Sequence, residues 1–269
     1  MADYPLLMSC VVLGVFAGFM GGMLGIGGGV IIVPVLVMLF DVRHLIPVEH
    51  ITNVAVGTSL TTIAFSSLAA ARAQVRRRAV RWDIVRAWAP ALVLGSLLAG
   101  LIAPWIPSHA ARLFIGGFLA VVATIMSTSW TPSPHRQLPD AAGNGLIAGL
   151  AGTVSGLAGI GGGNVIVPTL VYFNVAIHNA SATASALGVP IALFGAAGYI
   201  FSGRHALGLP DYSFGYVYLP AALTIVVTSV LTAPAGVAFG HRIPAAQLKR
   251  VFGIALALAA ARMIYSAVH

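Results

Sequence analysis

The segment Gly25–Pro34 reads GIGGGVIIVP, and the segment Gly159–Pro168 reads GIGGGNVIVP. The two closing prolines are 134 residues apart (168 − 34), about half of the 269-residue chain. Between the wider ranges Ala17–Leu36 and Ala151–Leu170, 12 of 20 aligned positions are identical. Glycines, a proline and a spacing shared in this way indicate that the chain is an internal duplication.

The composition is that of a membrane protein. Hydrophobic residues make up 59% of the chain, charged residues make up 7%, and the mean hydropathy is +0.97. Soluble domains carry about 25% charged residues. The segments Pro5–Phe40 and Ala141–Gly203 contain no Asp, Glu, Lys or Arg. We therefore expect an all-α polytopic membrane protein, and the apolar N-terminus has no basic region that would indicate a cleaved signal peptide.

The repeated glycine motif has two physical interpretations. Three consecutive glycines permit positive φ and leave their N–H groups uncovered, which predicts a broken helix whose second half begins near the last glycine. Such a start directs free N–H groups and the positive end of the helix dipole into the gap. The alternative is close helix packing, since small residues let membrane helices approach. Matching breaks in two halves favour a transporter's binding site.

Polar loops divide the rest of the chain into spans. The first repeat is assigned to residues 1–135 and the second to residues 136–269, and each contains a motif-bearing helical hairpin followed by three spans. The expected spans are Ile51–Ala71, Ala87–Ala103, Leu113–Ser129, Ala180–Ser202, Phe214–Gly240 and Val251–Val268. This predicts about ten helical elements and 8–10 membrane crossings.

The charges of equivalent loops predict that the repeats are inverted. Arg72–Arg86 contains six arginines, whereas its counterpart Gly203–Ser213 contains one. The next pair reverses, because Pro104–Arg112 has one basic residue and Gly240–Arg250 has three. Cytoplasmic loops carry the excess of Lys and Arg, so the cytoplasmic side switches between the halves. Both termini are then expected outside.

The net charge of +8 does not indicate nucleic acid as a partner. The arginines of Arg72–Arg86 form one short cluster, which the positive-inside rule explains and which suits contact with anionic lipid head groups. All six acidic residues fall in loops or at termini, so no mid-membrane carboxylate is expected for a cation or proton relay. We expect no catalytic residue, no metal site and no cofactor. An uncharged, glycine-lined midplane suits an anion held by backbone N–H groups, hydroxyls and amides.

The candidate substrate-binding residues are the glycines of both motifs and the polar residues beside them. They are Gly25, Gly27, Gly28, Gly29, Thr52, Asn53, Thr58, Ser59, Gly159, Gly161, Gly162, Gly163, Asn164, Thr183 and Ser185. The alternative for the hydroxyls is that they bond carbonyls of their own or neighbouring helices. Asn53 and Asn164 are the strongest candidates, because an amide within a membrane span needs a partner.

The duplicated motif also resembles a known family. The AGTVSGLAGIGGG form at Ala151–Gly163, the Thr/Ser/Gly-rich spans after each motif and the Val80–Asp83 end of the arginine loop are similar to the TauE/SafE sulfite exporter family over nearly the whole chain. The resemblance implies a secondary transporter of sulfite, sulfoacetate or a related organosulfonate in a bacterial inner membrane. It implies a site at the motif glycines and adjacent polar spans, made asymmetric by Val30 opposite Asn164.

The sequence leaves rival functions open. The main hypothesis is export of a small anion by alternating access, with the anion bound between two inverted repeats. A passive anion channel would share the glycine-lined site but would conduct without saturation. An intramembrane enzyme or assembly factor is disfavoured, because no nucleophile–base or metal-ligand set is visible. The sequence does not specify an oligomeric state.

Overall fold

The fold of the chain is almost entirely helical. The computed structural model describes residues 4–24, 27–127, 138, 140–240, 242 and 245–268. The helices of the first half are α1 (Tyr4–Leu24), α2 (Gly29–Arg43), α3 (Val48–Arg76), α4 (Trp82–Ile102), the 3₁₀ turn η1 (Ala103–Trp105) and α5 (Ser108–Ser127). Those of the second half are α6 (Ala141–Ala158), α7 (Gly163–Tyr172), α8 (Ile177–Ser202), α9 (Leu219–Gly240) and α10 (Ala245–Val268). A short hairpin of β1 (Ser213–Phe214) and β2 (Val217–Tyr218) joins α8 to α9.

The helix lengths confirm an all-α, multi-pass membrane protein. Within the described residues, six helices are long and apolar enough to cross a membrane: α1, α3, α4, α5, α8 and α9. The helices that follow the glycine motifs are shorter, with 15 residues in α2 and 10 in α7. At 1.5 Å per residue, α7 is about 15 Å long, which is half of a hydrocarbon core of about 30 Å.

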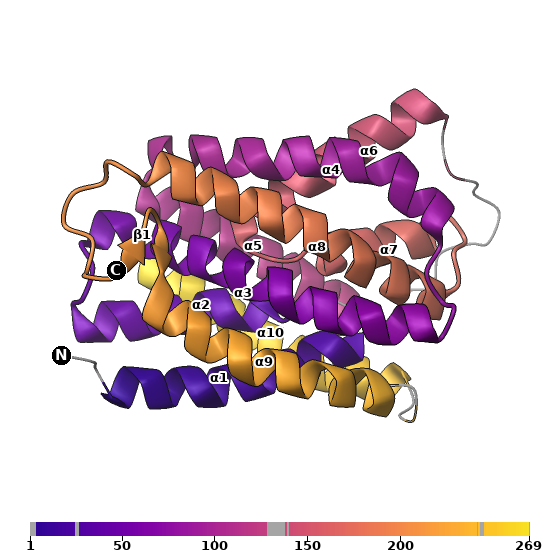
Figure 1. Ribbon diagram of the computed structural model, residues 1–269, viewed down its shortest axis with the longest axis horizontal. Helices are drawn as coiled ribbons and strands as arrows, with labels where there is room; N and C mark the ends of the chain where they lie inside the picture. The colour runs from indigo at the N-terminus through magenta and orange to yellow at the C-terminus, as the bar shows by residue number, and fades with distance from the viewer. Residues whose placement is uncertain are drawn as a thin grey trace.

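The two halves contain the same order of elements. Among the described residues, five α-helices precede the chain segment 128–140 and five follow it. In each half a glycine motif separates the first helix from the second. Both chain ends lie at one end of the bundle, where α1 begins, whereas α6 begins at the opposite end (Figure 1). The turn between α3 and α4 lies at that opposite end, together with the end of α9 (Figure 1).

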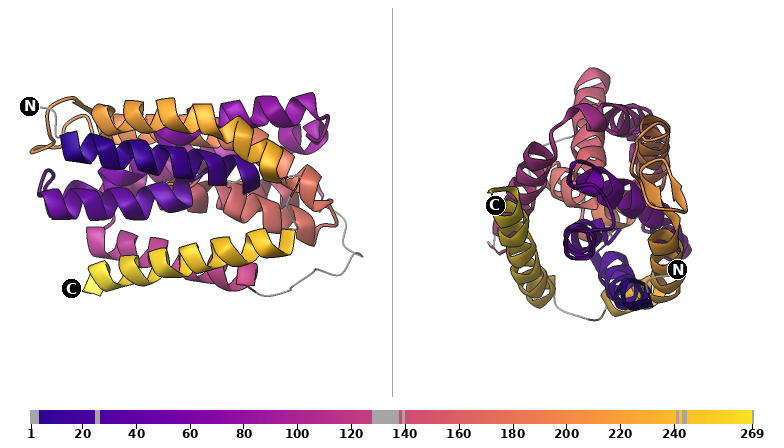
Figure 2. Two further views of the ribbon diagram at one scale, coloured as in Figure 1. Left: turned by 90° about the horizontal axis from the view of Figure 1, so that it is seen from below. Right: turned by 90° about the vertical axis from the view of Figure 1, so that its left-hand side faces the viewer.

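Helix pairing is unchanged when the halves are exchanged. The first helix of each half packs against the fourth of the other, as α1 against α9 and α6 against α4. The third helices, α3 and α8, pack together, and each contacts the fourth helix of the other half. The fifth helices form a pair, and α10 lies beside α5 along one side of the bundle (Figure 2). The halves are therefore interlocked rather than packed as two separate domains.

Small residues make the closest of these contacts. A Cβ added to Gly14 would lie 2.9 Å from the carbonyl oxygen of Ile225, so α1 meets the backbone of α9 directly. In the α4–α6 pair, a Cβ on Gly156 would lie 3.0 Å from the oxygen of Ser96. Backbone approach at small residues is a main source of helix association in lipid. At Gly14 and Gly156, which lie outside the motifs, glycine therefore serves close helix packing.

Arg112 differs from its expected place. Sequence analysis placed it in a loop, but it lies in the first turns of α5 with only 6% of its surface exposed. Its guanidinium donates to both carboxylate oxygens of Asp41, at 3.1 and 3.0 Å, and to the carbonyl oxygen of Ser266 at 3.2 Å. A buried arginine requires this degree of pairing. The ion pair joins α2 to the α5–α10 pair near one end of the bundle.

Candidate functional site

The two glycine motifs meet inside the bundle. A Cβ built on Gly27 would lie 3.6 Å from the Cα of Gly161, and one built on Gly161 would lie 3.8 Å from the Cα of Gly27. Gly29 faces the second motif just as closely, because its added Cβ would lie 2.5 Å from the carbonyl oxygen of Gly159. Two segments about 134 residues apart are thus in backbone contact. Gly25, the first candidate residue, lies outside the described residues.

Local geometry explains why glycine stands at these positions. Gly28 precedes α2 with φ 75°, and Gly162 precedes α7 with φ 79°. Both values fall in the left-handed region, which disfavours any residue with a Cβ. Gly159 ends α6 in the same conformation, with φ 68°. The chain therefore stops one helix and starts another at each motif, which confirms the expected break.

The starts of α2 and α7 carry unused hydrogen-bond donors. Among the described residues, no backbone acceptor pairs with the N–H groups of Gly29, Val30, Gly163 or Asn164. Free N–H groups in the first turn are general for helices, and they carry the positive end of the dipole. Here both helix starts lie at the point where the motifs meet, and Gly28, Gly29 and Gly163 are buried.

Asn164 is the most unusual polar side chain of the site. It lies in the first turn of α7 and is 4% exposed. Neither its amide nitrogen nor its amide oxygen has a hydrogen-bond partner among the described residues. A buried amide without a partner costs about 1–3 kcal/mol, so its retention needs a compensating role. The position equivalent to it in the first motif is the apolar Val30.

The central helix α3 crosses the meeting point of the motifs. Ser59 donates a 2.8 Å hydrogen bond to the carbonyl oxygen of Gly159 and so ties α3 to the second motif. Further along α3, Ser67 lies among three glycines. Its hydroxyl oxygen would be 3.1 Å from a Cβ added to Gly27 and 3.0 Å from a Cβ added to Gly188. Sequence reasoning missed Ser67. A serine in a span rich in Ser and Thr carries no local signal that would have set it apart.

Thr52 and Asn53 lie away from the motifs. They are six or more residues before Ser59 on α3, a separation of about 10 Å along the helix. Thr52 shares a 3.0 Å hydrogen bond with Ser108 and accepts one of 3.3 Å from Arg112. The Asn53 side chain lies near the Tyr216 side chain. The candidate residues of α3 thus fall into two separate places.

Three further candidates make hydrogen bonds within the fold. Thr58 accepts from the backbone N–H of Tyr218 at 3.0 Å, and Thr183 accepts from that of Arg81 at 3.1 Å. Ser185 donates to the carbonyl oxygen of Ser181, one turn earlier in α8. Only Ser185 matches the alternative given above, a bond to a helix carbonyl, because Thr58 and Thr183 accept from backbone N–H groups. A substrate role for the three residues stays a prediction.

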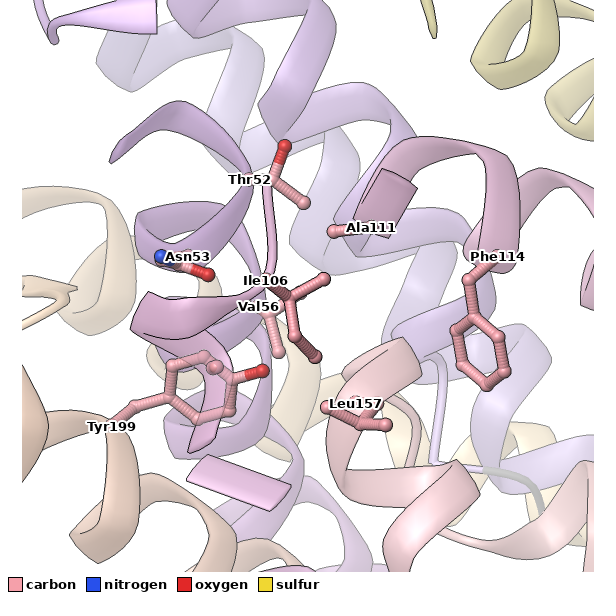
Figure 3. A pocket seen from close by; sticks show the side chains of 9 residues that line it. Thr52, Asn53, Val56, Ile106, Ala111, Phe114, Leu157 and Tyr199 are labelled. Atoms are coloured by element: carbon pink, nitrogen blue, oxygen red, sulfur yellow. The ribbon is translucent and has the colours of Figure 1, made fainter. Parts of the chain in front are cut away.

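A cavity of about 150 Å³ lies beside Thr52 and Asn53. Figure 3 shows its lining side chains, which come from α3, η1 and the residues around it, α5, α6 and α8. They are Thr52, Asn53, Val56, Ala103, Ile106, Ala111, Phe114, Leu157 and Tyr199. Val56 also contacts the second motif, since a Cβ on Gly159 would lie 3.0 Å from its Cγ1. The cavity is therefore next to the motif contact and separated from it by apolar side chains.

Comparison with known proteins gives a consistent result. The family model described as sulfite exporter TauE/SafE matches residues 10–263. A probable membrane transporter protein of Haemophilus influenzae is 31% identical over 261 residues, which cover 97% of this chain and 98% of that protein. Another, MJ0441 of Methanocaldococcus jannaschii, is 25% identical and covers 91% of this chain and 90% of its own length. No solved structure matches the chain.

Proposed function

This chain belongs to the TauE/SafE sulfite exporter family, and we propose on that premise that it exports a small sulfur-containing anion as a secondary transporter. The relatives carry the names of membrane transporter proteins, and the protein is a multi-pass membrane transporter rather than an enzyme. The proposal adds the substrate class, which is sulfite, sulfoacetate or a related organosulfonate. It also adds the location, a bacterial inner membrane, and an alternating-access mechanism.

The observation that carries the proposal is the contact between the two glycine motifs beside Asn164. The starts of α2 and α7 both lie there, and each contributes roughly half a positive charge from its dipole. Their free N–H groups and the unpartnered Asn164 amide are donors for the oxygens of an anion. Glycine at Gly27 and Gly161 lets an anion approach the backbone closely.

The donors proposed for the anion are backbone N–H groups and an amide, and none of these described groups carries a full positive charge. Such a site suits transport. Donors that are neutral bind an anion reversibly, and a transported ion must also leave. The membrane potential then favours outward movement, because one negative charge gains about 2.3 kcal/mol per 100 mV on leaving a negative-inside cell. Export therefore requires no dedicated carboxylate relay.

The second component of the proposal is that the halves are inverted repeats that rock against each other. Three observations support it: α1 and α6 begin at opposite ends, helix pairing is preserved when the halves are exchanged, and the candidate site lies where the halves meet. Inverted repeats with interrupted helices at the interface are the usual basis of alternating access.

The test is the substitution Asn164→Val, which copies the first motif into the second. It removes a buried, unpartnered amide, so we expect thermal stability in detergent to be kept or raised. Efflux of radiolabelled sulfite or sulfoacetate from proteoliposomes should fall by at least about tenfold, the loss expected for one hydrogen bond to an anion. Thr124→Ala is the control, because that hydroxyl is exposed and bonded to the carbonyl oxygen of Ala120 within α5.

The outcomes separate the hypotheses. Unchanged efflux in Asn164→Val would refute the motif site. Flux that does not saturate and shows no counterflow would identify a passive anion channel. Saturable flux of anions without sulfur, and none of sulfite or sulfonates, would retain the transporter and reject the substrate class.

A further inference from the structure

The cavity beside α3 contains a polar group that the fold leaves unused. Tyr199 of α8 is 1% exposed, yet the described residues offer its hydroxyl no hydrogen-bond partner. Figure 3 shows this hydroxyl directed into the cavity, toward Ile106 and Leu157. A buried hydroxyl in a membrane-embedded region normally has a partner, so the cavity is where its partner must come from.

A second polar side chain borders the same space. Asn53 lines the cavity together with Tyr199 (Figure 3), and its amide offers both donors and an acceptor. The first turn of α5 also borders the cavity, through Ala111, and it carries the positive end of that helix dipole. The polar side of the cavity is therefore suited to an anionic head group.

The rest of the wall is apolar. Val56, Ile106, Phe114 and Leu157 supply it, and none of them can replace water around a strongly hydrated inorganic ion. The volume of about 150 Å³ is that of roughly five water molecules. A sulfonate group carrying one short alkyl chain has this size and this division into a polar and an apolar part.

We propose that this cavity is a binding subsite for small alkyl sulfonates, with the Tyr199 hydroxyl as the donor to the sulfonate oxygens. The inference rests on the proposed function for its class of solute, and it adds a second place where that solute binds. Val56 both lines the cavity and contacts Gly159, so an anion held here is next to the glycine motifs. The subsite favours organic over inorganic sulfur anions because of its apolar wall.

The test is calorimetric binding of methanesulfonate to the purified full-length protein in detergent. Tyr199→Phe removes a single hydroxyl, and we expect it to weaken methanesulfonate binding about tenfold. Tyr212→Phe makes the same chemical change at a loop residue that is 78% exposed, and it should have no effect. Ala111→Leu fills the cavity and should abolish binding while the thermal unfolding temperature is kept or raised.

The outcomes distinguish this proposal from the function proposed above. Methanesulfonate binding that is unaffected by Tyr199→Phe and by Ala111→Leu would overturn the subsite, even if sulfite efflux still depends on Asn164. Affinity that rises steadily from methanesulfonate to hexanesulfonate and ignores Tyr199 would identify a groove for lipid chains and would also overturn it. Tyr199-dependent binding in a protein that moves no sulfur anion would support the subsite and refute the transport function.

Discussion

Replacing Gly29 with alanine tests whether the contact between the two motifs matters. Gly29 is the first residue of α2, and its φ is not in the left-handed region, so alanine is otherwise acceptable there. The added methyl group would lie 2.5 Å from the oxygen of Gly159 and 3.0 Å from the Cα of Ile160. Both are backbone atoms of the opposite motif and cannot rotate away.

The structure sets the size of the expected effect. The methyl group reaches ordinary contact at 3.4 Å, so the motifs must separate by about 0.9 Å (3.4 − 2.5). Such overpacking costs about 1–3 kcal/mol, partly offset by the gain of about 1 kcal/mol from glycine to alanine in a helix. We expect a net loss of stability of up to about 2 kcal/mol. Because binding groups must be held within about 0.5 Å, anion efflux should fall at least about tenfold.

Gly117→Ala is the matched control. Gly117 lies within α5, and a Cβ added to it meets nothing within 4 Å. This variant should keep its efflux and should be as stable as the natural protein or more stable by up to about 1 kcal/mol. The assays are thermal unfolding in detergent and sulfite efflux from proteoliposomes. If Gly29→Ala matches Gly117→Ala in both assays, the close contact between the motifs does not serve transport.

Two further predictions concern the ion pairs and the topology. Asp41→Asn breaks the buried ion pair with Arg112 and should lower the free energy of unfolding by about 3 kcal/mol. As the control, Asp83→Asn in the exposed ion pair with Arg81 should lower it by less than about 1 kcal/mol. Equal losses of stability in the two variants would contradict a special contribution of the Arg112 ion pair. Cysteines introduced at Arg77 and Arg242 should react with a membrane-impermeant reagent from the same side of the membrane, and a cysteine introduced at Asp211 should react from the other side. The natural Cys10 is buried and should give little background. Labelling of positions 77 and 242 from opposite sides would refute the inverted topology.

The helix breaks were predictable from the sequence, whereas one loop length and the β-hairpin were not. The break at each motif followed from glycine alone, because consecutive residues without Cβ allow the positive φ seen at Gly28 and Gly162. The expected loop Gly240–Arg250 is shorter than predicted, since α10 begins at Ala245. The hairpin β1–β2 was not predicted, because its two-residue strands carry no periodic pattern.

The candidate site required information that no local pattern holds. The sequence selected Asn53 and Asn164 as amides in need of partners. Only the packing of the helices decides that Asn53 lines a cavity and that Asn164 has no partner among the described residues. The same holds for Tyr199, an ordinary aromatic residue of an apolar span until its hydroxyl is seen in a cavity.

The sequence by itself determined the duplication, the membrane class, the ten helical elements and the two helix breaks, because each depends on residues close together in the chain: an apolar run, a loop charge or a glycine triplet. The tertiary structure alone decided that the two motifs touch, that Ser67 lies between them, and that Thr52 and Asn53 belong to a separate cavity. Those facts join residues that are from tens to more than a hundred positions apart. They depend on how closely whole helices pack, and the sequence periodicity of one helix does not specify which helix packs against it.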